Sequence, residues 1–423
     1  MNGKHIIIIG GGAGGLMSAI VAARELEKHC VKAEITILEK NDRVGKKLLS
    51  TGNGRCNITN INADIDKYHG SNVKFALSAI KSFSPYDAIG FFESIGVFCR
   101  TEDDGKVYPI TNQAGSVLDL LRLECNRLNI NQICNFCAES IKIAANGFDV
   151  VSSDGKIIHG DTVIVATGSL AGEKSRSTNA GYKLLTDLGH TITPLHPALV
   201  QLKSDNKFVK SMSGIKVNAK ASAYLNNEKA REEYGEVLFT DYGLSGPAVF
   251  ALSRLASENG KLEIALDLLP DYNAETVYNW LTDRRASHPD WALEDYLTGI
   301  VNKRIGQTLI RSLNMFSLSE KVSSLKQNHI KAIAGTLKHW HFNITGTMPW
   351  QNAQVCAGGI VSDDFDPKTL QSKKVKGLYA VGEILDIDGD CGGYNLQWAW
   401  SCAAAAGKAV AQAITDIRKD VVN

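Results

Sequence analysis

The chain has almost no excess of charge of either sign. Its 423 residues include 46 Lys and Arg and 45 Asp and Glu, so the formal net charge is +1. Nucleic acids and anionic membranes select proteins with a concentrated positive surface, and this balance of charges offers no such attraction. We therefore expect a small-molecule substrate and no nucleic-acid or membrane partner, while the sequence leaves the oligomeric state open.

Long apolar stretches are also missing. The longest are short, such as residues 6–9 and 162–166, whereas a membrane-spanning helix needs about 20 apolar residues. The first residues lead directly into a strand and glycines, without the apolar segment of a secretory signal. A cytoplasmic location is expected, with the nine cysteines as free thiols. Cys134 and Cys137 form a C-x-x-C pair, but without a second pair a redox or metal role is not favoured.

A glycine-rich turn satisfies the pattern G-x-G-x-x-G through Gly10, Gly12 and Gly15. It lies between an apolar stretch typical of a strand and a stretch of helix formers. In such a unit the first glycine permits a tight turn, the second lets a pyrophosphate approach the backbone, and the third lets the helix pack closely on the strand. Glu39 closes the next predicted strand, where its carboxylate would accept hydrogen bonds from ribose hydroxyls. The turn therefore predicts a bound ADP moiety.

Two later segments decide between NAD and FAD. Ala166-Thr167-Gly168 at a strand end and residues 377–383 resemble the further signatures of two-dinucleotide-domain FAD proteins of the glutathione-reductase type. The resemblance implies that Glu383 holds the ribityl chain of FAD, with Asp386 as a candidate helper. No second G-x-G-x-x-G follows a strand, so a separate NAD(P)H domain is not expected. An NAD-only dehydrogenase stays an alternative.

The order of predicted elements indicates an α/β fold that is interrupted by an insertion. Strand–helix–strand patterns predict a Rossmann-like FAD-binding domain of the glutathione-reductase type, made from residues 1–193 and 354–423. Alternating strand-like runs predict an inserted antiparallel β unit at residues 194–269 and 339–353. Residues 270–338 are more polar and have helical spacing, which predicts a small helical unit within the insertion.

Two loops carry a more specific resemblance. Residues 46–60 and 392–399 are similar to the hallmark segments of the BaiN-like flavoproteins, a family widely labelled aminoacetone oxidase or NAD(P)/FAD-dependent oxidoreductase. Shorter matches are at residues 105–109, 239–247 and 357–360, so the resemblance spans nearly the whole chain. The chain departs from it at Asp241 and Cys356, where the family usually carries His and Thr, and these departures concern the substrate rather than FAD.

These loops complete the expected FAD site. Backbone amides freed by their glycines would face the flavin, and the start of the helix after Gly393 would stabilise negative charge on the reduced ring. Arg55 and Asn57 offer donors for the flavin edge or for a substrate. Alternatively, Arg55 is a structural ion-pair partner and the glycines form only tight turns. The expected FAD contacts are Gly10, Gly12, Ala13, Gly14, Gly15, Glu39, Lys40, Arg43, Lys47, Gly52, Asn53, Gly54, Arg55, Cys56, Asn57, Ala138, Thr167, Gly168, Gly382, Glu383, Asp386, Gly393, Tyr394, Asn395 and Leu396.

The function predicted from these features is that of a flavin-dependent oxidoreductase. It would transfer a hydride equivalent between a small organic substrate and flavin N5, with oxygen or NAD(P)H as the other partner. The family labels imply an amine or a conjugated carbonyl compound as substrate. The alternative is an FAD-containing binding or RNA-modifying protein without small-molecule redox turnover.

Several residues are not assigned to this chemistry. Cys56 stands alone in its loop, which disfavours a disulfide reductase. No pair of residues has a spacing that identifies a proton-transfer group, so no catalytic residue is assigned. His339 and His341 are two apart on a strand-like stretch, yet no third ligand is near in sequence and no metal is expected. The charged run of residues 228–236 is predicted to be an exposed loop or hairpin tip.

Overall fold

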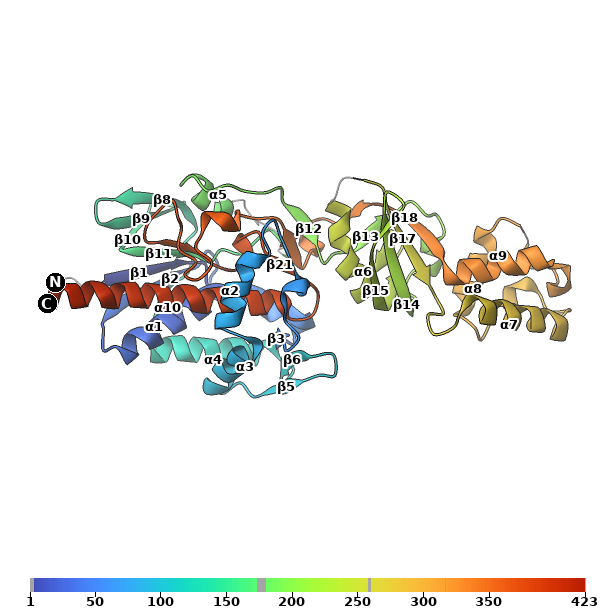
Figure 1. The fold of residues 1–423 in the computed structure, drawn as a ribbon, viewed down its shortest axis with the longest axis horizontal. Coiled ribbons are helices and arrows are strands. Elements are labelled where there is room, and N and C mark those ends of the chain that lie inside the picture. Colours follow the sequence, from blue (N-terminus) through green and yellow to red (C-terminus); the bar gives the residue numbers. More distant parts are fainter. Residues whose placement is uncertain (1–3, 173–179, 258–259, 316, 423) are drawn as a thin grey trace. The chain divides into compact units, whose positions relative to one another are not determined.

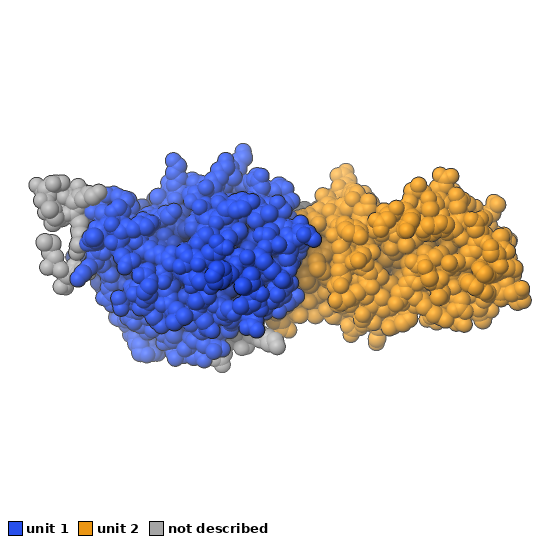
Figure 2. Space-filling view, turned by 90° about the horizontal axis from the view of Figure 1, so that it is seen from below, with its two compact units in different colours: residues 1–196, 355–423 blue, residues 197–354 orange. Residues whose placement is uncertain are grey.

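The computed structural model of the chain describes residues 4–172, 180–257, 260–315 and 317–422. It contains two compact units, shown in blue and orange in Figure 2. Unit 1 comprises Met1–His196 and Val355–Asn423, and unit 2 comprises Pro197–Gln354. The domain boundaries predicted at residues 193 and 353 fall next to these divisions, and the four-part domain assignment stays a prediction.

Unit 1 is built on a five-stranded sheet with the order β20-β11-β1-β2-β7. Every neighbouring pair in this sheet is parallel. Ile6, Ile7 and Ile8 of the central strand are fully buried, as expected for a strand covered on both faces. The arrangement confirms the predicted α/β class with a Rossmann-like domain. The strands are Lys4–Ile9 (β1), Ala33–Leu38 (β2), Asn131–Ile133 (β7), Thr162–Val165 (β11) and Leu378–Ala380 (β20).

Helices cover one face of this sheet, and a smaller antiparallel sheet covers the other (Figure 1). The helices α1 and α10 are in close contact, since a Cβ added at Gly407 would lie 2.8 Å from the carbonyl oxygen of Ser18. Both helices follow a strand of the parallel sheet in the chain, so both begin on the side where the strands end. The helices are Ala13–Lys28 (α1), Ala114–Arg127 (α4) and Tyr394–Val422 (α10), and the small sheet contains Ala138–Ala144 (β8), Gly147–Ser152 (β9) and Ile157–Gly160 (β10).

The helical pattern of residues 73–95 is interrupted in the structure. Apolar side chains have helical spacing throughout this stretch, but the structure divides it into two helices, Lys74–Ser82 (α2) and Pro85–Ser94 (α3). Ser84 caps α3, because its hydroxyl accepts a hydrogen bond from the amide of Asp87 and the Asp87 carboxylate accepts one from the amide of Ser84. Pro85 occupies the first helical position, which a proline favours and a continuous helix would not allow.

The remaining elements of unit 1 are short and lie in its loops. The first part of the loop at residues 46–60 is the 3₁₀ turn η1. Two antiparallel pairings organise the other loops, namely a sheet of order β3-β6-β5 and the pair β21-β4. These elements are η1 (Lys46–Gly54), β3 (Thr59–Asn60), η2 (Ile65–Lys67), β4 (Tyr68–His69), β5 (Cys99–Thr101), β6 (Lys106–Pro109), α5 (Ala180–Thr186), β19 (Val355–Ala357), η8 (Ser362–Asp364), η9 (Gly382–Ile384) and β21 (Asp388–Gly389).

Unit 2 is a closed barrel with attached helices. Six strands close in the order β13-β16-β15-β14-β17-β18, and all neighbouring pairs are antiparallel. Apolar side chains fill it, and the rings of Phe239 and Phe342 are fully buried with centroids 5.9 Å apart. The strands are Leu202–Ser204 (β13), Lys216–Leu225 (β14), Glu228–Phe239 (β15), Gly243–Ser245 (β16), Leu262–Asp267 (β17) and Trp340–Thr347 (β18). The helices among the described residues of this unit are Pro247–Leu252 (α6), Ala274–Ser287 (α7), Lys303–Ser312 (α8) and Gln327–Lys338 (α9). Its 3₁₀ turns are η3 (Val209–Met212), η4 (Ser253–Ser257), η5 (Leu293–Asp295), η6 (Val322–Ser324) and η7 (Trp350–Asn352).

Two strands in this part of the chain differ from what the sequence indicates. The charged run of residues 228–236, predicted to be an exposed loop or hairpin tip, begins beside the tip of the β14–β15 hairpin but is itself the first part of β15, paired with β14. The strand-like stretch of residues 198–203 is divided into β12 (His196–Ala198) and β13, because Leu199 between them has a left-handed φ of 48° that interrupts the extended backbone.

The cysteines are unpaired, as the sequence predicted. All nine cysteines are free thiols, including Cys134 and Cys137. Among the described residues no helix combines the length and apolar character that crossing a lipid bilayer requires.

Candidate functional site

The glycine turn places three glycines in three different surroundings. Gly10 has a φ of 105°, and a Cβ there would lie 2.4 Å from the carbonyl oxygen of Ala166. A Cβ on Gly15 would lie 1.9 Å from the carbonyl oxygen of Gly10, so α1 packs on the turn at a distance that only glycine allows. Gly12, in contrast, has no neighbour within 4 Å of an added Cβ. The open glycine is the second of the motif, the position that a pyrophosphate approaches.

The N-terminus of α1 is also open, because its N-cap residue has no side chain. Gly12 is the N-cap residue and no side chain caps the helix. The first amides of a helix, here those from Gly12 to Gly15, have no partner within the helix and carry its positive dipole end. Gly14 is buried against the side chain of Val381, 3.4 Å from an added Cβ. The arrangement offers unpaired backbone donors to an anion beside Gly12.

The carboxylate of Glu39 is held next to this turn. Its Oε2 accepts a hydrogen bond of 2.7 Å from the amide of Gly11, and its Oε1 accepts two from Asn41, from the amide at 2.9 Å and from Nδ2 at 2.6 Å. A carboxylate accepts about four hydrogen bonds, so capacity remains for a ribose hydroxyl. Lys40 and Arg43, two further expected FAD contacts, are both exposed.

Asn57 carries a buried oxygen without a partner. Its side chain is in a residue only 8% exposed, and Oδ1 accepts no hydrogen bond. A Cβ added to Gly393 would lie 2.9 Å from this oxygen, so Oδ1 faces the turn that precedes α10. Because an orphaned buried acceptor is costly, the position marks where a donor such as a flavin ring N–H fits.

Arg55 lies in the same loop but is already paired. Its Nη2 donates to Glu102 Oε1 at 2.6 Å, and Nε and Nη2 both donate to Asn112 Oδ1, at 3.1 and 3.0 Å. Its guanidinium lies 3.9 Å from the ring centroid of Tyr108. This is the geometry of the structural ion-pair alternative rather than that of a free donor.

The residues just before Arg55 form a left-handed turn. Gly52, Asn53 and Gly54 have φ angles of 56°, 54° and 84°. Cys56 follows with its side chain fully buried, and burial raises the pKa of its thiol to about 12. The thiol is therefore protonated at neutral pH, which agrees with the expectation that it takes no part in disulfide chemistry.

Glu383 is fixed by two contacts at the end of β20. Its Oε2 accepts a hydrogen bond of 2.8 Å from Lys47 Nζ, and its Oε1 accepts one of 3.0 Å from the amide of Cys356. Lys47 and Glu383 are both expected FAD contacts, and the structure pairs them with each other. Asp386 is 3% exposed and accepts a hydrogen bond from the amide of Ser71 at 3.1 Å.

The turn before α10 is held together by its own side chains. Asn395 exchanges two hydrogen bonds of 2.8 Å with the backbone of Gly389. The carbonyl oxygen of Tyr394 accepts a hydrogen bond from the hydroxyl of Tyr68 at 3.1 Å. A Cβ on Gly393 would lie 2.5 Å from the carbonyl oxygen of Thr59, so this glycine is required by close approach. Leu396, in the first turn of α10, is half-buried.

The two later signature segments contain further open positions. Gly168 and Gly382 have φ angles of 69° and 78°, and an added Cβ at either would meet nothing within 4 Å. Thr167, next to Gly168 in the chain, has a buried Oγ1 without a partner. Ala138, at the start of β8, is 9% exposed. Open glycines at three strand ends and orphaned oxygens at Asn57 and Thr167 are the features that an extended dinucleotide with a polar ring edge fits.

One pair of titratable residues near the turn before α10 was not predicted from the sequence. His69 Nε2 lies 2.8 Å from Asp390 Oδ1, and the two side chains are 24% and 11% exposed. β4 and β21 bring them together although they are 321 positions apart. Sequence spacing carries no signal for a pair of this kind.

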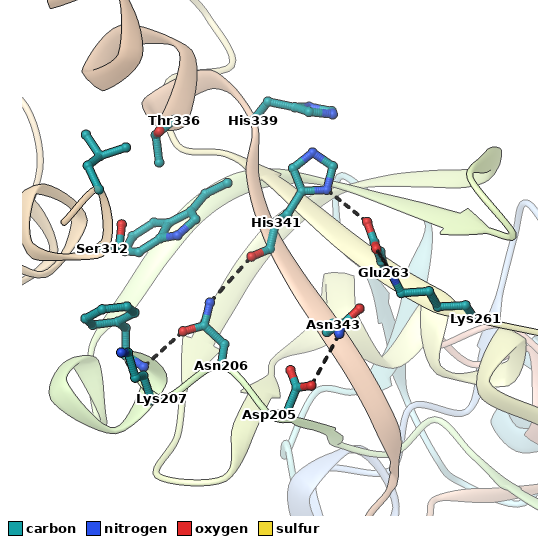
Figure 3. A pocket seen from close by; sticks show the side chains of 13 residues that line it. Asp205, Asn206, Lys207, Lys261, Glu263, Ser312, Thr336, His339, His341 and Asn343 are labelled. Atoms are coloured by element: carbon teal, nitrogen blue, oxygen red, sulfur yellow. Dashed lines mark hydrogen bonds and ion pairs between the residues drawn. The ribbon is translucent and has the colours of Figure 1, made fainter. Parts of the chain in front are cut away.

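A separate hollow of about 700 Å³ lies in unit 2, and Figure 3 shows its lining. His341 Nδ1 is 3.2 Å from Glu263 Oε2, and the rings of His339 and His341 are 4.6 Å apart. Glu263 also pairs with Lys261 at 2.5 Å. Among the described residues, no group of three or more His, Cys, Asp or Glu side chains is arranged to hold a metal ion.

Comparison with known proteins gives matches along the whole chain. The family model described as HI0933-like protein Rossmann domain matches residues 4–409. A 3-dehydro-bile acid delta(4,6)-reductase of Clostridium scindens is 38% identical over 413 residues, covering 97% of this chain and 99% of that protein. Ribosomal RNA dihydrouridine synthases of Haemophilus influenzae and Escherichia coli are 28% and 29% identical, over 96% and 94% of this chain and 98% and 96% of their own lengths.

The fold and the loops at its strand ends define an FAD-binding Rossmann protein, an oxidoreductase that takes its redox chemistry from the flavin. The chain belongs to the HI0933-like protein Rossmann domain family. The resemblance of its loops to BaiN-like flavoproteins is thereby confirmed, as is FAD as the predicted cofactor. Which residues contact FAD stays a prediction.

Proposed function

We propose that this protein reduces a carbon–carbon double bond conjugated with a carbonyl group, with NAD(P)H as electron donor. The observation that carries the proposal is the full-length similarity to a 3-dehydro-bile acid delta(4,6)-reductase, 38% identical over 97% of this chain. That name describes reduction of double bonds in a compound with a 3-oxo group. A steroid-type small molecule is therefore the substrate class we favour, and an amine is not.

The named relatives share one type of bond. A dihydrouridine is a uridine whose C5–C6 double bond, conjugated with the C4 carbonyl, has been reduced. Both relatives' names thus describe reduction of a double bond next to a carbonyl. In such a reduction a hydride equivalent adds to the carbon β to the carbonyl and a proton adds to the α carbon. When bound, FAD supplies the hydride equivalent.

The residues of unit 1 have separate parts in this scheme. The open amides at Gly12 would bind the pyrophosphate, and Glu39 would accept hydrogen bonds from the adenosine ribose. Asn57 Oδ1 would accept a hydrogen bond from the flavin edge. The N-terminal amides of α10 would stabilise negative charge that develops on the ring, because the positive end of the helix dipole lies there.

The test is an anaerobic experiment on the FAD-loaded protein. NADPH or NADH first bleaches the flavin absorbance, and a 3-oxo-4,6-diene steroid, its saturated 3-oxo counterpart or an amine is then mixed in. We expect the dienone to restore the oxidised flavin spectrum at least about 100-fold faster than the saturated ketone, since only it has a bond that accepts the hydride. Equal rates for the two steroids would contradict the proposal.

A second candidate function is reduction of uridine in ribosomal RNA. It is favoured by the similarity to two ribosomal RNA dihydrouridine synthases over more than nine tenths of the chain. The near-equal numbers of basic and acidic residues count against it, since RNA binding needs a concentrated positive surface. Unmodified ribosomal RNA in the same mixing experiment separates the two: reoxidation by RNA but not by the dienone would replace the small-molecule substrate with RNA.

A further inference from the structure

The reduction proposed above needs a proton donor for the α carbon, and this inference rests on that proposed function. General acids in enzymes are side chains that carry an exchangeable proton and remain accessible to substrate. The expected flavin edge lies at the turn before α10, residues 389–393, because Asn57 faces this turn with an unpartnered buried oxygen. Several titratable groups surround this turn in unit 1.

Most of these groups are unsuited to giving up a proton. Cys56 is fully buried, and burial raises its thiol pKa to about 12. Tyr68 and Tyr394 are 3% and 7% exposed, and burial raises the pKa of both hydroxyls. Lys106 is held in an ion pair of 2.5 Å with Asp104. Burial also raises the pKa of the Cys391 thiol.

His69 is more accessible than the buried tyrosines and Cys56, and unlike Lys106 it carries a ring that can hold a carboxylate at one nitrogen and a substrate at the other. Its side chain is 24% exposed, while the carboxylate 2.8 Å from its Nε2, that of Asp390, is only 11% exposed. A buried carboxylate beside one ring nitrogen orients an imidazole, as in the histidine–aspartate pairs of hydrolases. An imidazole also exchanges protons near neutral pH.

The backbone fixes this pair next to the turn. The amide of Asp390 donates to the carbonyl oxygen of Lys67 at 2.8 Å, and β21 pairs Asp388 with His69. The hydroxyl of Tyr68 donates to the carbonyl oxygen of Tyr394, the first residue of α10. Hence β4, which carries His69, is hydrogen-bonded to the start of α10. The turn before α10 is the one that faces Asn57.

We propose that His69, positioned by Asp390, delivers the proton to the α carbon of the substrate. Two electrons arrive at the β carbon as the hydride equivalent, the π bond breaks, and the His69 proton forms the new C–H bond at the α carbon. His69 becomes neutral and is reprotonated by solvent, and NAD(P)H supplies the electrons. The charged groups close to the pair are Lys67 and Asp66 on η2, Asp388 on β21, and Lys106 with Asp104 near β6.

The first test separates the two half-reactions in His69→Gln and Asp390→Asn. Flavin reduction by NADPH should stay within twofold of the parent protein, and the FAD dissociation constant should not change. Reoxidation by the conjugated ketone should slow by about 100-fold or more in His69→Gln, since a general acid contributes about 10²–10⁴-fold. Asp390→Asn, which removes only the positioning group, should slow it less. An unchanged reoxidation rate in His69→Gln overturns the proposal.

His159→Gln is the matched control. His159 Nδ1 also lies 2.8 Å from a carboxylate oxygen, that of Asp149, but on the β9–β10 hairpin with side chains 53% and 36% exposed. The variant should leave both half-reactions unchanged. If it slows reoxidation as much as His69→Gln does, the effect is general and the assignment to His69 falls.

Two readouts distinguish proton delivery from a structural role. Imidazole added to His69→Ala should restore reoxidation in proportion to its concentration, because it replaces the missing acid. In D₂O the parent protein should place deuterium on one face of the α carbon of a 3-oxo-4-ene steroid, and His69→Gln on both faces. Absence of rescue together with unchanged stereochemistry overturns the inference while leaving the reductase function intact. If no conjugated ketone reoxidises the parent protein, the reductase function itself fails, and the inference with it.

Discussion

The loops of unit 1 and the hollow of unit 2 both gather polar side chains, but they differ in how those side chains are used. In the hollow, Glu263 pairs with Lys261 and His341, and Asn343 donates to Asp205 (Figure 3). None of the residues lining it has a buried polar atom without a partner. The hollow is large, but its hydrogen-bonding groups are largely paired with one another.

The loops of unit 1 show the opposite pattern. An added Cβ at Gly12, Gly168 or Gly382 would meet nothing within 4 Å, and Asn57 and Thr167 have buried oxygens without partners. Unsatisfied groups of this kind are expensive unless a ligand completes them. The difference supports the predicted FAD contacts in unit 1, because buried groups without partners, rather than a large hollow, gain most from a bound ligand.

The largest effect should come from Gly15→Ala. Its Cβ would lie 1.9 Å from the carbonyl oxygen of Gly10, a backbone atom that cannot move without shifting β1 or α1. We expect a loss of about 3 kcal/mol or more in the free energy of unfolding, together with loss of FAD, measured by denaturation and flavin absorbance. Gly90→Ala, in α3 with no neighbour near an added Cβ, is the control and should be tolerated. A stable Gly15→Ala protein would contradict the close packing of α1 on the turn.

Gly12→Ala should separate cofactor binding from folding. The residue has a φ of −82°, which alanine adopts, and nothing stands near its Cβ, so stability should change by no more than about 1 kcal/mol. The methyl group would instead occupy the space a pyrophosphate needs, and the FAD dissociation constant should rise by about 100-fold, close to 2.8 kcal/mol. Titration of apoprotein with FAD measures this. Unimpaired FAD binding would show that the open glycine does not face the phosphates.

Asn57→Ala tests the orphaned oxygen. Because Oδ1 has no partner in the protein, we expect no loss of stability in the apoprotein. FAD affinity should fall about tenfold, the value of one hydrogen bond of about 1.4 kcal/mol. Asn395→Ala is the contrasting variant: its side chain exchanges hydrogen bonds with the backbone of Gly389, so its removal should destabilise the apoprotein. If Asn57→Ala destabilises the apoprotein as well, the oxygen has a structural role.

The Lys47–Glu383 pair should give a smaller effect. The side chains are 37% and 18% exposed, so solvent screens their 2.8 Å contact. A double-mutant cycle of Lys47→Met and Glu383→Gln should give a coupling of about 0.5–1 kcal/mol in apoprotein stability. The same cycle on FAD affinity should show that Glu383→Gln weakens binding more than Lys47→Met does. The reverse order would make Lys47, rather than Glu383, the stronger contact of FAD.

What the sequence predicted well was local. The glycine turn from Gly10 to Gly15 and the strand that Glu39 closes lie in short segments whose spacing encodes a turn or a strand end, and the parallel sheet follows from the same segments. Partners far apart in the chain were not predicted: Lys47 meets Glu383 and His69 meets Asp390 only because the sheet and the β4–β21 pair bring remote loops together. Sequence spacing carries no information about such contacts.

The misassigned strand has a different cause. Residues 228–236 form a charged run, and this run predicted an exposed loop or hairpin tip. In the structure the first part of β15 is exposed or half-buried on both of its faces, so no apolar face exists to be detected. Its pairing with β14, including the Ser222–Glu232 hydrogen bond of 2.9 Å, is what makes it a strand.

The smallest effect should come from the hollow of unit 2. The pKa of His339 lies below its ordinary value, first because burial disfavours the charged form and then because His341 is close. The folded protein therefore binds fewer protons than the unfolded chain, and stability should fall as pH drops below about 6.5. His339→Gln should lessen this fall by on the order of 1 °C in Tm between pH 7.5 and 5.5, and His288→Gln should not. Zinc should leave both the Tm and the FAD affinity unchanged. A rise in Tm with zinc that His339→Gln abolishes would make the hollow a ligand site and remove the contrast with unit 1.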